Sequence, residues 1–571
     1  MVFILFGALL IFTTDLNTVS ATSTNMIYVN GSSGNDAWNG QSSTYQSGIT
    51  GPKKSIKNAT GTITKYGTIK IAKGVYSGIK NTNITITKSM TIIGQTMKST
   101  IINGTNTNTI FLIKPGVILN LNNLTITNGV SKDSSGSITN LGTLTISKCY
   151  FSYNKADIGS AILNHGNLKI DQTSFYENHA VSGGAVFNNG ILQLSDSVFI
   201  GNYGKDGGAI YSLEKSFNVT NCSFKNNYAT GAGGAICKNG GIMNVNSTIF
   251  TGNSGFAGGA LYSILNITNI TQCKFSNNGK MADNTMGGGI YLYGGKMVVK
   301  YSTFMGNIGS QGGAIENGDT MQIMGCKFIK NKAKDMGGVI INDYLTHLTV
   351  KSSTFLLNGG TSYGGNVLYN GGTANLHYNR IIATESVIYD DGGIADVSYN
   401  WWGSNYPNFS SIILNTGGGK TNYKPWIYMT FKTVPAVIYV GSKGTKLVVS
   451  FNQVFNGKTM KSIDPANGHI PDGTSVNFKT GYGNLKVQPE IGQTNDGIAT
   501  AIFKSNKVGK TLLTANTDSQ TLNSTVTVLP NKNIFNENKK TVGMQDTGLP
   551  IAPLALAAIS LIAGLTYNKK R

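Results

Sequence analysis

The chain has 571 residues, of which 40% are hydrophobic and 12% charged. This length allows two or three domains with large cores, and the hydrophobic fraction excludes a disordered chain. The formal net charge is +21, but lysine carries nearly all of it and the only arginines are Arg380 and Arg571. Because arginine is the usual residue for bidentate phosphate recognition, and the lysines are scattered, we expect no nucleic-acid partner.

The first residues resemble an export signal. Val2–Phe12 is an apolar run, and Val19-Ser20-Ala21 offers the small-x-small pattern that signal peptidase reads. We therefore predict a signal peptide over residues 1–21, with a short transmembrane helix as the alternative. The run lacks a basic segment before it, which leaves the true start of the protein open.

An internal repeat dominates the middle of the chain. The pattern Phe-x-x-Asn recurs nine times, at intervals of 24 to 29 residues, and a Gly-Gly-Ala-Ile-like motif follows each asparagine. The phenylalanines are Phe151, Phe175, Phe199, Phe224, Phe250, Phe275, Phe304, Phe328 and Phe355. The asparagines are Asn154, Asn178, Asn202, Asn227, Asn253, Asn278, Asn307, Asn331 and Asn358.

Each repeat contains short stretches in which apolar and polar residues alternate, such as Leu144/Ile146 and Leu348/Val350 before the phenylalanine. Alternation with period two predicts a strand with one buried face. A single repeat cannot bury that face, whereas stacked coils bury it and pair every backbone group. The sequence therefore predicts an all-β fold, a right-handed parallel β-helix over residues 22–428. The asparagines would turn the corners in left-handed backbone conformations and form ladders from coil to coil.

One column of small residues supports the predicted inward direction. The residue two before each phenylalanine is Cys149, Thr173, Ser197, Cys222, Thr248, Cys273, Ser302, Cys326 or Ser353. No two of these cysteines belong to adjacent coils. Coils stack about 4.8 Å apart, so the nearest pair should be roughly 9 to 10 Å apart, beyond the limit of about 7 Å between the Cα atoms of a disulfide. We expect buried free thiols, and Cys237 has no obvious partner.

The solenoid should extend beyond the repeats in both directions. Alternating segments at residues 68–71, 84–87, 90–93 and 119–127 predict the first coils, and residues 27–30 a cap. Coils should continue to about residue 400, where Trp401-Trp402-Gly403 predicts an aromatic plug that covers the open edge.

These residues resemble known surface proteins. The Gly-Gly-Ala-Ile and Phe-x-x-Asn elements are similar to the repeats of chlamydial polymorphic outer-membrane proteins. The opening IYVNGSSGNDAWNG, the Asn-Trp-Trp-Gly at residues 400–403 and the C-terminal apolar segment resemble adhesin-like surface proteins of methanogenic archaea. The resemblance covers roughly residues 25–428. The chain lacks the C-terminal outer-membrane barrel of the chlamydial proteins, which favours the archaeal comparison. The resemblance implies a role at the cell surface and does not identify the ligand.

The pattern changes after residue 428. Alternating strands separated by turn signals over residues 429–530 predict an Ig-like β-sandwich, and the segments PDGT at 471–474 and DGIATA at 496–501 resemble bacterial Ig-like domains of invasin and intimin stalks. Residues 531–548 are polar and predict a linker. Residues 549–567 are apolar enough for a transmembrane anchor, and the basic residues 568–571 would form a cytoplasmic tail. The rest of the chain would then lie outside the cell.

Three functions remain open from the sequence. We favour an adhesin-like protein that binds glycans, surface proteins of other cells or its own cell-wall polymer. The alternatives are a polysaccharide lyase or hydrolase, since β-helices also carry such enzymes, and a passive structural protein of the envelope. Enzymes of this kind need clustered carboxylates, yet the chain has only 25 acidic residues.

The acidic residues and histidines give little sign of a site. Asp390-Asp391 is the sole adjacent acidic pair in the solenoid, and its side chains should point to opposite faces; a pairing of Asp390 with Arg380 is conceivable. A surface column of Asp157, Asp206 and Asp335 that binds cations is a further possibility, against the simpler role of aspartate in turns. The histidines are His165, His179, His347, His377 and His469, without metal-ligand spacing. We therefore expect no catalytic, cofactor-binding or metal site.

Twelve Asn-x-Ser/Thr sequons could carry N-linked glycans on an exported protein. The candidate asparagines are Asn30, Asn58, Asn83, Asn103, Asn123, Asn218, Asn221, Asn246, Asn266, Asn269, Asn408 and Asn523.

Overall fold

The computed structural model describes residues 25–131, 135–280, 284–383, 385–481 and 487–531. The predicted signal peptide, the anchor at 549–567, the basic tail and nearly all of the linker lie outside these residues. Among the residues that the structure describes, no helix is long and apolar enough to cross a membrane.

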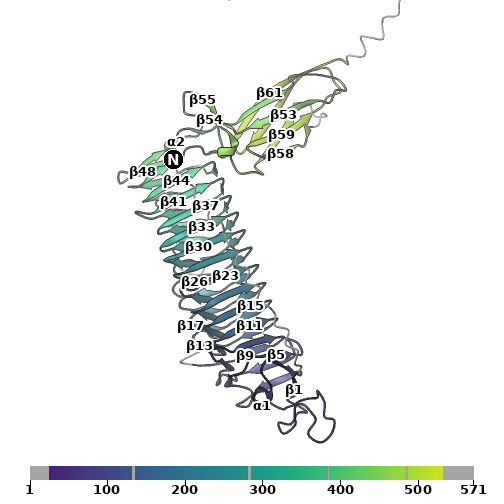
Figure 1. The fold of residues 1–571 in the computed structure, drawn as a ribbon. Coiled ribbons are helices and arrows are strands. Elements are labelled where there is room, and N and C mark those ends of the chain that lie inside the picture. The colour runs from purple at the N-terminus through teal and green to yellow at the C-terminus, as the bar shows by residue number, and fades with distance from the viewer. Residues whose placement is uncertain (1–24, 132–134, 281–283, 384, 482–486, 532–571) are drawn as a thin grey trace, which may run out of the picture.

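Most of the molecule is an elongated parallel β-solenoid, which confirms the predicted β-helix (Figure 1). Its three faces are sheets of 16, 14 and 13 strands. One representative coil contributes β14 (Ile162–Asn164), β15 (Asn167–Asp171) and β16 (Ser174–Tyr176), one strand to each sheet. The 16-stranded sheet runs from β1 (Met26–Val29) to β49 (Lys420–Asn422). Every pairing within the three sheets is parallel, so each coil repeats the register of its neighbour.

The nine phenylalanines form one continuous stack inside the solenoid. Neighbouring rings lie 4.4 to 5.1 Å apart between centroids and within 3 to 13° of parallel. Phe275 pairs with Phe250 and Phe304 in the same register as the other phenylalanines. The longer spacing between Phe275 and Phe304 is therefore absorbed outside the strands.

The nine asparagines form a buried ladder, as predicted. The Nδ2 of each of the first eight donates to Oδ1 of the asparagine in the next coil at 2.8 to 3.1 Å, and that of Asn358 donates to the backbone oxygen of Phe328. The expected left-handed backbone, however, belongs to the residue before each asparagine: Tyr153 has φ 56°, Glu177 47° and Lys330 54°. The chain must bend there because Phe and Asn, three residues apart, both point inward. The small column is buried as well, and its hydroxyls accept backbone N–H groups of adjacent coils.

A second polar ladder, which the sequence did not reveal, lines the 14-stranded sheet. Asn140 donates to Asn164 at 2.7 Å, and Asn164 to Asn188 at 2.6 Å. The ladder resumes with Asn317, and other residues occupy the equivalent positions in the coils between Asn188 and Asn317. One of these residues is Lys238, whose Nζ donates to the backbone oxygens of Leu213 and Lys215. The set that begins with Asn317 ends with Asn342 and Asn370, and its last amide donates to Asp390. Where asparagines are consecutive in this ladder, their buried amides satisfy each other's hydrogen-bonding groups.

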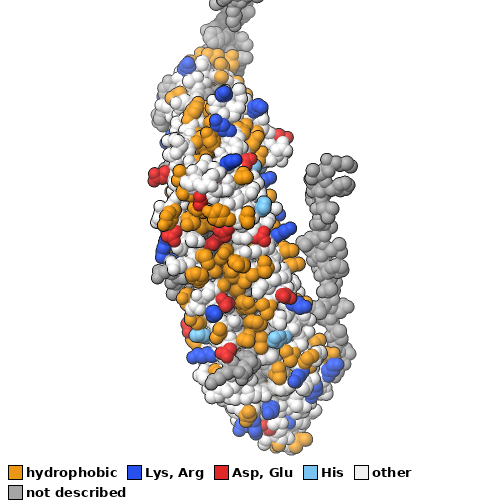
Figure 2. All heavy atoms as spheres, turned by 90° about the vertical axis from the view of Figure 1, so that its left-hand side faces the viewer, with side chains coloured by type: hydrophobic (Ala, Val, Ile, Leu, Met, Phe, Trp, Pro, Cys, Tyr) orange, Lys and Arg blue, Asp and Glu red, His pale blue; other side chains and the backbone are white. Residues whose placement is uncertain are grey.

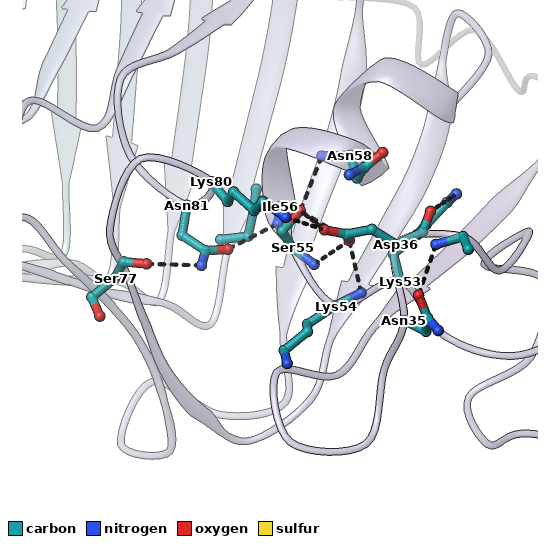
Figure 3. A network of polar contacts seen from close by, with 11 residues as sticks. Asn35, Asp36, Lys53, Lys54, Ser55, Ile56, Asn58, Ser77, Lys80 and Asn81 are labelled. Carbon is teal, nitrogen blue, oxygen red and sulfur yellow. Dashed lines mark hydrogen bonds and ion pairs between the residues drawn. The ribbon is translucent and has the colours of Figure 1, made fainter.

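The N-terminal end of the solenoid is covered by a short helix, α1 (Ile56–Thr62), which the sequence did not predict. Residues 27–30, the predicted cap, instead belong largely to β1, which pairs with β2 (Gly67–Ile71). Figure 3 shows how the helix start is held: Ser55 Oγ accepts the N–H of Asn58, and the Asp36 carboxylate accepts from Ser55 and from the N–H of Lys54. Burial alone would raise the pKa of Asp36, but these hydrogen bonds outweigh it and lower the pKa.

At the opposite end the two tryptophans separate instead of forming one plug. Trp402 is buried in the solenoid core beside Phe409 of α2 (Phe409–Ile412), whereas Trp401 is buried in the core of the C-terminal unit. The coils continue past the tryptophans to β48 (Ile413–Thr416) and β49. These strands lie within the predicted solenoid bounds of residues 22–428, but beyond the last coil expected near residue 400, because the last coils lack the repeated motif.

The C-terminal unit is an all-β region with mostly antiparallel strands and its own core. One sheet orders β51 (Thr430–Val434), β53 (Thr445–Ser450), β59 (Ile498–Phe503) and β57 (Val487–Gln488). The other orders β52 (Val437–Tyr439), β61 (Gln520–Leu529), β60 (Gly509–Thr517), β56 (Ser475–Thr480) and β58 (Ile491–Gln493). A small sheet of β50 (Trp426–Ile427), β54 (Gln453–Phe455) and β55 (Met460–Ser462) adjoins the solenoid end, so the unit begins slightly before residue 429.

A buried ion pair joins the two units. Arg380, on the solenoid strand β45 (Arg380–Ile382), donates from Nε and Nη2 to the Asp518 carboxylate, and Trp401 Nε1 donates to the same carboxylate at 2.8 Å. Asp518 occupies the tight turn between β60 and β61, and its side chain is only 3% exposed. Arg380 therefore links the solenoid to the C-terminal unit, and its conceivable pairing with Asp390 was wrong.

Candidate functional site: an aromatic stripe on the 14-stranded sheet

One outward-facing column of the 14-stranded sheet is unusually rich in aromatic rings. The middle residue of each three-residue strand points away from the core, and in register these residues meet along the solenoid axis. We call the aromatic members of this column the aromatic stripe: Phe187, Tyr211, Tyr262, Tyr291, Tyr369 and Tyr389. Cys237, Glu316 and Ile341 fill positions between them.

The rings of the aromatic stripe pair across adjacent coils. Phe187 and Tyr211 lie 5.4 Å apart between centroids, Tyr262 and Tyr291 5.3 Å, and Tyr369 and Tyr389 5.1 Å. Figure 2 views the side of the solenoid where Figure 1 labels β17 (His179–Ser182), β26 (Ile236–Asn239) and β48. Hydrophobic side chains form a long band on this face, with acidic side chains among them.

The paired-glycine motifs explain why these outward side chains are partly buried. The first glycine of each motif turns the chain back toward the sheet, with φ 52° at Gly159 and 63° at Gly337. A Cβ at Gly159 would lie 2.9 Å from Cβ of Phe187, and one at Gly337 would lie 2.5 Å from the Ile341 side chain. Only glycine permits this approach. The turns at the first glycines therefore pack against one side of the column and partly bury its side chains.

Glu316 is the most unusual member of the column. It lies on β36 (Ile315–Asn317) between Tyr291 and Ile341, is 3% exposed, and its Oε2 has no hydrogen-bond partner. Burial, and then the charge of nearby Asp343, raise the pKa of Glu316 well above its usual value; burial also raises the pKa of Asp343 to about 6. Burial thus favours the neutral form of the Glu316 carboxyl group, and its Oε2 can still form a hydrogen bond.

A second carboxylate lies near the C-terminal end of the stripe. Asp391, on β46 (Ile388–Asp391), accepts hydrogen bonds from the hydroxyls of Tyr369 at 2.6 Å and Tyr344 at 3.1 Å. The bond from Tyr369 is the main reason that the pKa of Asp391 is lowered. Asp390 points inward, fully buried, and ends the second asparagine ladder. The two side chains face opposite sides, as the alternation predicted, and do not act together.

The structure does not bring the acidic column together. Asp206 Oδ1 accepts the N–H of Ala232 and Asp335 accepts the hydroxyl of Ser310, so each fixes a turn of a neighbouring coil. Asp157 lies on β13 (Lys155–Ile158), two coils before Asp206. These contacts favour the role of turn residues over a cation-binding surface.

The five cysteines are free and buried, and Cys149, Cys222, Cys273 and Cys326 lie inside the coils as expected, whereas Cys237 belongs to the outward-facing column. Burial raises the pKa of Cys149, Cys222 and Cys326 to about 12 and that of Cys273 to about 11, and it raises the pKa of Cys237 further. Thiols of this kind are poor nucleophiles at neutral pH, which leaves them a packing role.

One predicted glycosylation site must be corrected. Asn266 is 3% exposed; its amide accepts from Ser263 and Thr268 and donates to the backbone of Lys238, so a glycan has no room there. The other eleven sequon asparagines are exposed or half-buried and remain candidates.

Sequence reasoning missed Glu316 because it looked for pairs of acids close in sequence. The sequence feature that could have revealed Glu316 is its position, the third residue after the second glycine of a paired-glycine motif. Apolar or aromatic residues hold most of these positions in the mid-solenoid coils, for example Phe187, Tyr211 and Ile341, and a lone glutamate there stands out.

Comparisons with known proteins support the solenoid repeats. A family model of the Chlamydia polymorphic membrane protein repeat matches residues 196–213 and 221–239. These segments cover two of the nine Phe-x-x-Asn repeats, so the match supports the kind of repeat and not membership of the whole chain in the family. No curated protein matches the sequence.

Two solved structures show distant likeness. One is the catalytic unit of a GH87 alpha-1,3-glucanase from Streptomyces thermodiastaticus, with 14% identity, a TM-score of 0.40, and coverage of 67% of this chain and 68% of that one. The other is a rhamnogalacturonan lyase, with 13% identity, a TM-score of 0.28, and coverage of 58% and 82%. At these values the likeness concerns the chain's general path and says nothing about its activity.

Proposed function

We propose that the protein is an adhesin-like surface protein whose right-handed β-helix rod binds glycan chains along the aromatic stripe. The observation that carries this proposal is the series of outward tyrosine rings on one face, with carboxyl groups at Glu316 and Asp391 beside them. Aromatic rings pack against the apolar faces of sugars while polar groups bind their hydroxyls, and sites of this composition orient ligands. The ligand would be a glycan of another cell or a polymer of the protein's own envelope.

The ends of the chain fit this role as further parts of the proposal. Residues 1–21 would direct export, residues 549–567 would anchor the chain in the membrane, and the C-terminal unit would be an Ig-like stalk between anchor and rod. The rod would then project the aromatic stripe away from the cell surface.

Binding to immobilised polysaccharides tests the proposal. The full-length protein would be applied to a neutral glucan, to chitin and to wall polymer from the producing cells. Replacing Tyr262 and Tyr369 together by alanine should weaken binding about tenfold or more, which corresponds to a loss of about 1.4 kcal/mol for the two rings together. The control is Tyr66→Ala, an exposed tyrosine outside the stripe that is 52% exposed. Equal binding by all three proteins, or no binding to any polymer, would overturn the proposal.

A polysaccharide-cleaving enzyme is the second candidate, and Glu316 is the observation that favours it. A protonated Glu316 could donate its proton to a glycosidic oxygen while Asp343, ionised above pH 6, accepts a proton from the attacking water. Any polymer that the protein binds would be incubated with it and assayed for new reducing ends. Cleavage that Glu316→Gln abolishes would support the enzyme, and intact polymer would exclude it.

A further inference from the structure

Three possible metal ligands meet on the loops of the C-terminal unit. His469 follows the 3-10 turn η1 (Pro465–Asn467), Asp472 precedes β56, and Asp496 lies between β58 and β59. One ligand atom from each lies within 4.8 Å of the other two. The sequence pattern does not reveal this group, because β56, β57 and β58 lie between Asp472 and Asp496.

The imidazole of His469 is oriented to bind through one defined nitrogen. Nδ1 lies 2.8 Å from the carbonyl oxygen of Ile470. Because a carbonyl only accepts, this contact places the proton on Nδ1 and leaves the lone pair on Nε2, which lies 3.7 Å from Asp496 Oδ1. A backbone carbonyl that fixes the tautomer in this way is the usual support of a metal-binding histidine.

The two carboxylates are held together but remain accessible. The N–H of Asp496 donates to Asp472 Oδ1 at 2.9 Å, which joins the two loops. The side chains of Asp472 and Asp496 are 53% and 64% exposed, and that of His469 is 22% exposed. An ion can therefore reach all three without a change in the core.

The group borders the junction between the two units. A cleft of about 350 Å³ is lined by His469 and Asp472 from the C-terminal unit and by Tyr301, Lys327 and Ser352 from the solenoid. Ser352 Oγ donates to the carbonyl oxygen of His469 at 3.3 Å. Any ligand that fixes the His469 loop therefore also fixes one wall of this cleft.

We propose that His469, Asp472 and Asp496 bind a divalent transition-metal ion such as Zn²⁺, and that the ion stiffens the junction between the solenoid and the C-terminal unit. One imidazole and two carboxylates with an open position for water match the ligand set that zinc accepts. Calcium instead takes six to eight oxygen ligands and disfavours this set. The ion would hold together two loops, residues 468–474 and 494–497, that only a few hydrogen bonds now join.

Titration of the metal-free full-length chain with Zn²⁺ alone tests the proposal. Calorimetry should show one site, and His469→Ala and Asp496→Asn should each lower its affinity about tenfold or more, the scale on which zinc sites respond to lost support. His347→Ala, which removes an exposed histidine from the solenoid strand β41 (His347–Lys351), is the matched control and should bind as the parent does. Asp496 is preferred to Asp472 because the Asp472 carboxylate also holds the loop together.

Two further readouts separate the site from surface binding. Co²⁺ should give visible absorption bands that His469→Ala abolishes, and Zn²⁺ should slow hydrogen exchange in residues 468–473 and 494–497 and around Ser352. Unchanged affinity in both variants, tighter binding of Ca²⁺ than of Zn²⁺, or absence of a saturable site would each overturn the proposal. Slower exchange confined to the loops, without an effect at Ser352, would refute the stiffening of the junction.

Discussion

The solenoid and the C-terminal unit bury their cores in different ways. In the solenoid each buried residue contacts its equivalents one coil away, as in the phenylalanine stack and the asparagine ladder. In the C-terminal unit antiparallel strands far apart in sequence meet around one core that includes Leu447, Phe478 and Val526. The solenoid should therefore unfold locally, coil by coil, whereas the C-terminal unit should unfold cooperatively as a whole.

The largest expected effect comes from Phe304, in the middle of the stack. Phe304→Ala should cost about 3 to 5 kcal/mol of stability. Met305→Ala, on the half-buried outer side, should cost less than about 1 kcal/mol. Hydrogen exchange should rise in the coils beside Phe304, while Phe151 and the C-terminal unit keep their protection. Uniform loss of protection from hydrogen exchange along the chain would show that the solenoid does not unfold locally.

The junction should show the next largest effect. Arg380→Ala leaves the Asp518 carboxylate buried without its charge partner, at a cost of about 3 kcal/mol. Exchange should increase at Trp401–Gly403 and in the turn at 517–520, and proteolysis should separate the units more readily. If exchange at these places is unchanged, the ion pair does not hold the units together.

A smaller effect distinguishes a buried ladder from an exposed one. Asn253→Ala removes one member of the buried ladder and takes the acceptor Oδ1 away from the backbone N–H and the Nδ2 of Asn227, which should cost about 1 to 3 kcal/mol. Asn244 belongs to an exposed ladder with Asn218 and Asn269, and Asn244→Ala should change stability by no more than about 0.5 kcal/mol. Denaturant unfolding of both variants measures the difference, and equal costs would contradict the importance of burial.

A gradual pH dependence of stability should come from Lys238. Burial lowers its pKa from 10.5 to about 8, so between these values the unfolded chain binds more protons than the folded chain. Stability should therefore rise with pH from about 8 to 10.5, by no more than about 1 kcal/mol per pH unit, and this rise should disappear in Lys238→Met. If the stability of the parent protein and of Lys238→Met changed with pH in the same way, the Lys238 amine would not be desolvated in the folded protein.

The sequence predicted the parts of the molecule that repeat. Phe151 to Phe355, the asparagine ladder and the small column all follow from period and alternation, because each coil presents the same evidence again. The predictions failed where a single contact decides the structure. The split of Trp401 from Trp402, the pairing of Arg380 with Asp518, and the approach of His469 to Asp496 depend on how distant segments meet. Glu316 is an intermediate case, since only its column reveals it.

Hydroxyl-radical footprinting tests, without any substitution, whether the aromatic stripe binds glycan. The full-length chain would be labelled alone and in the presence of a polysaccharide that it binds. The account predicts that Tyr211, Tyr262, Tyr369 and Tyr389 become protected while the exposed Tyr66 and Tyr153 stay equally reactive. Protection that falls on the 16-stranded sheet or on the C-terminal unit, with the stripe still reactive, would contradict it.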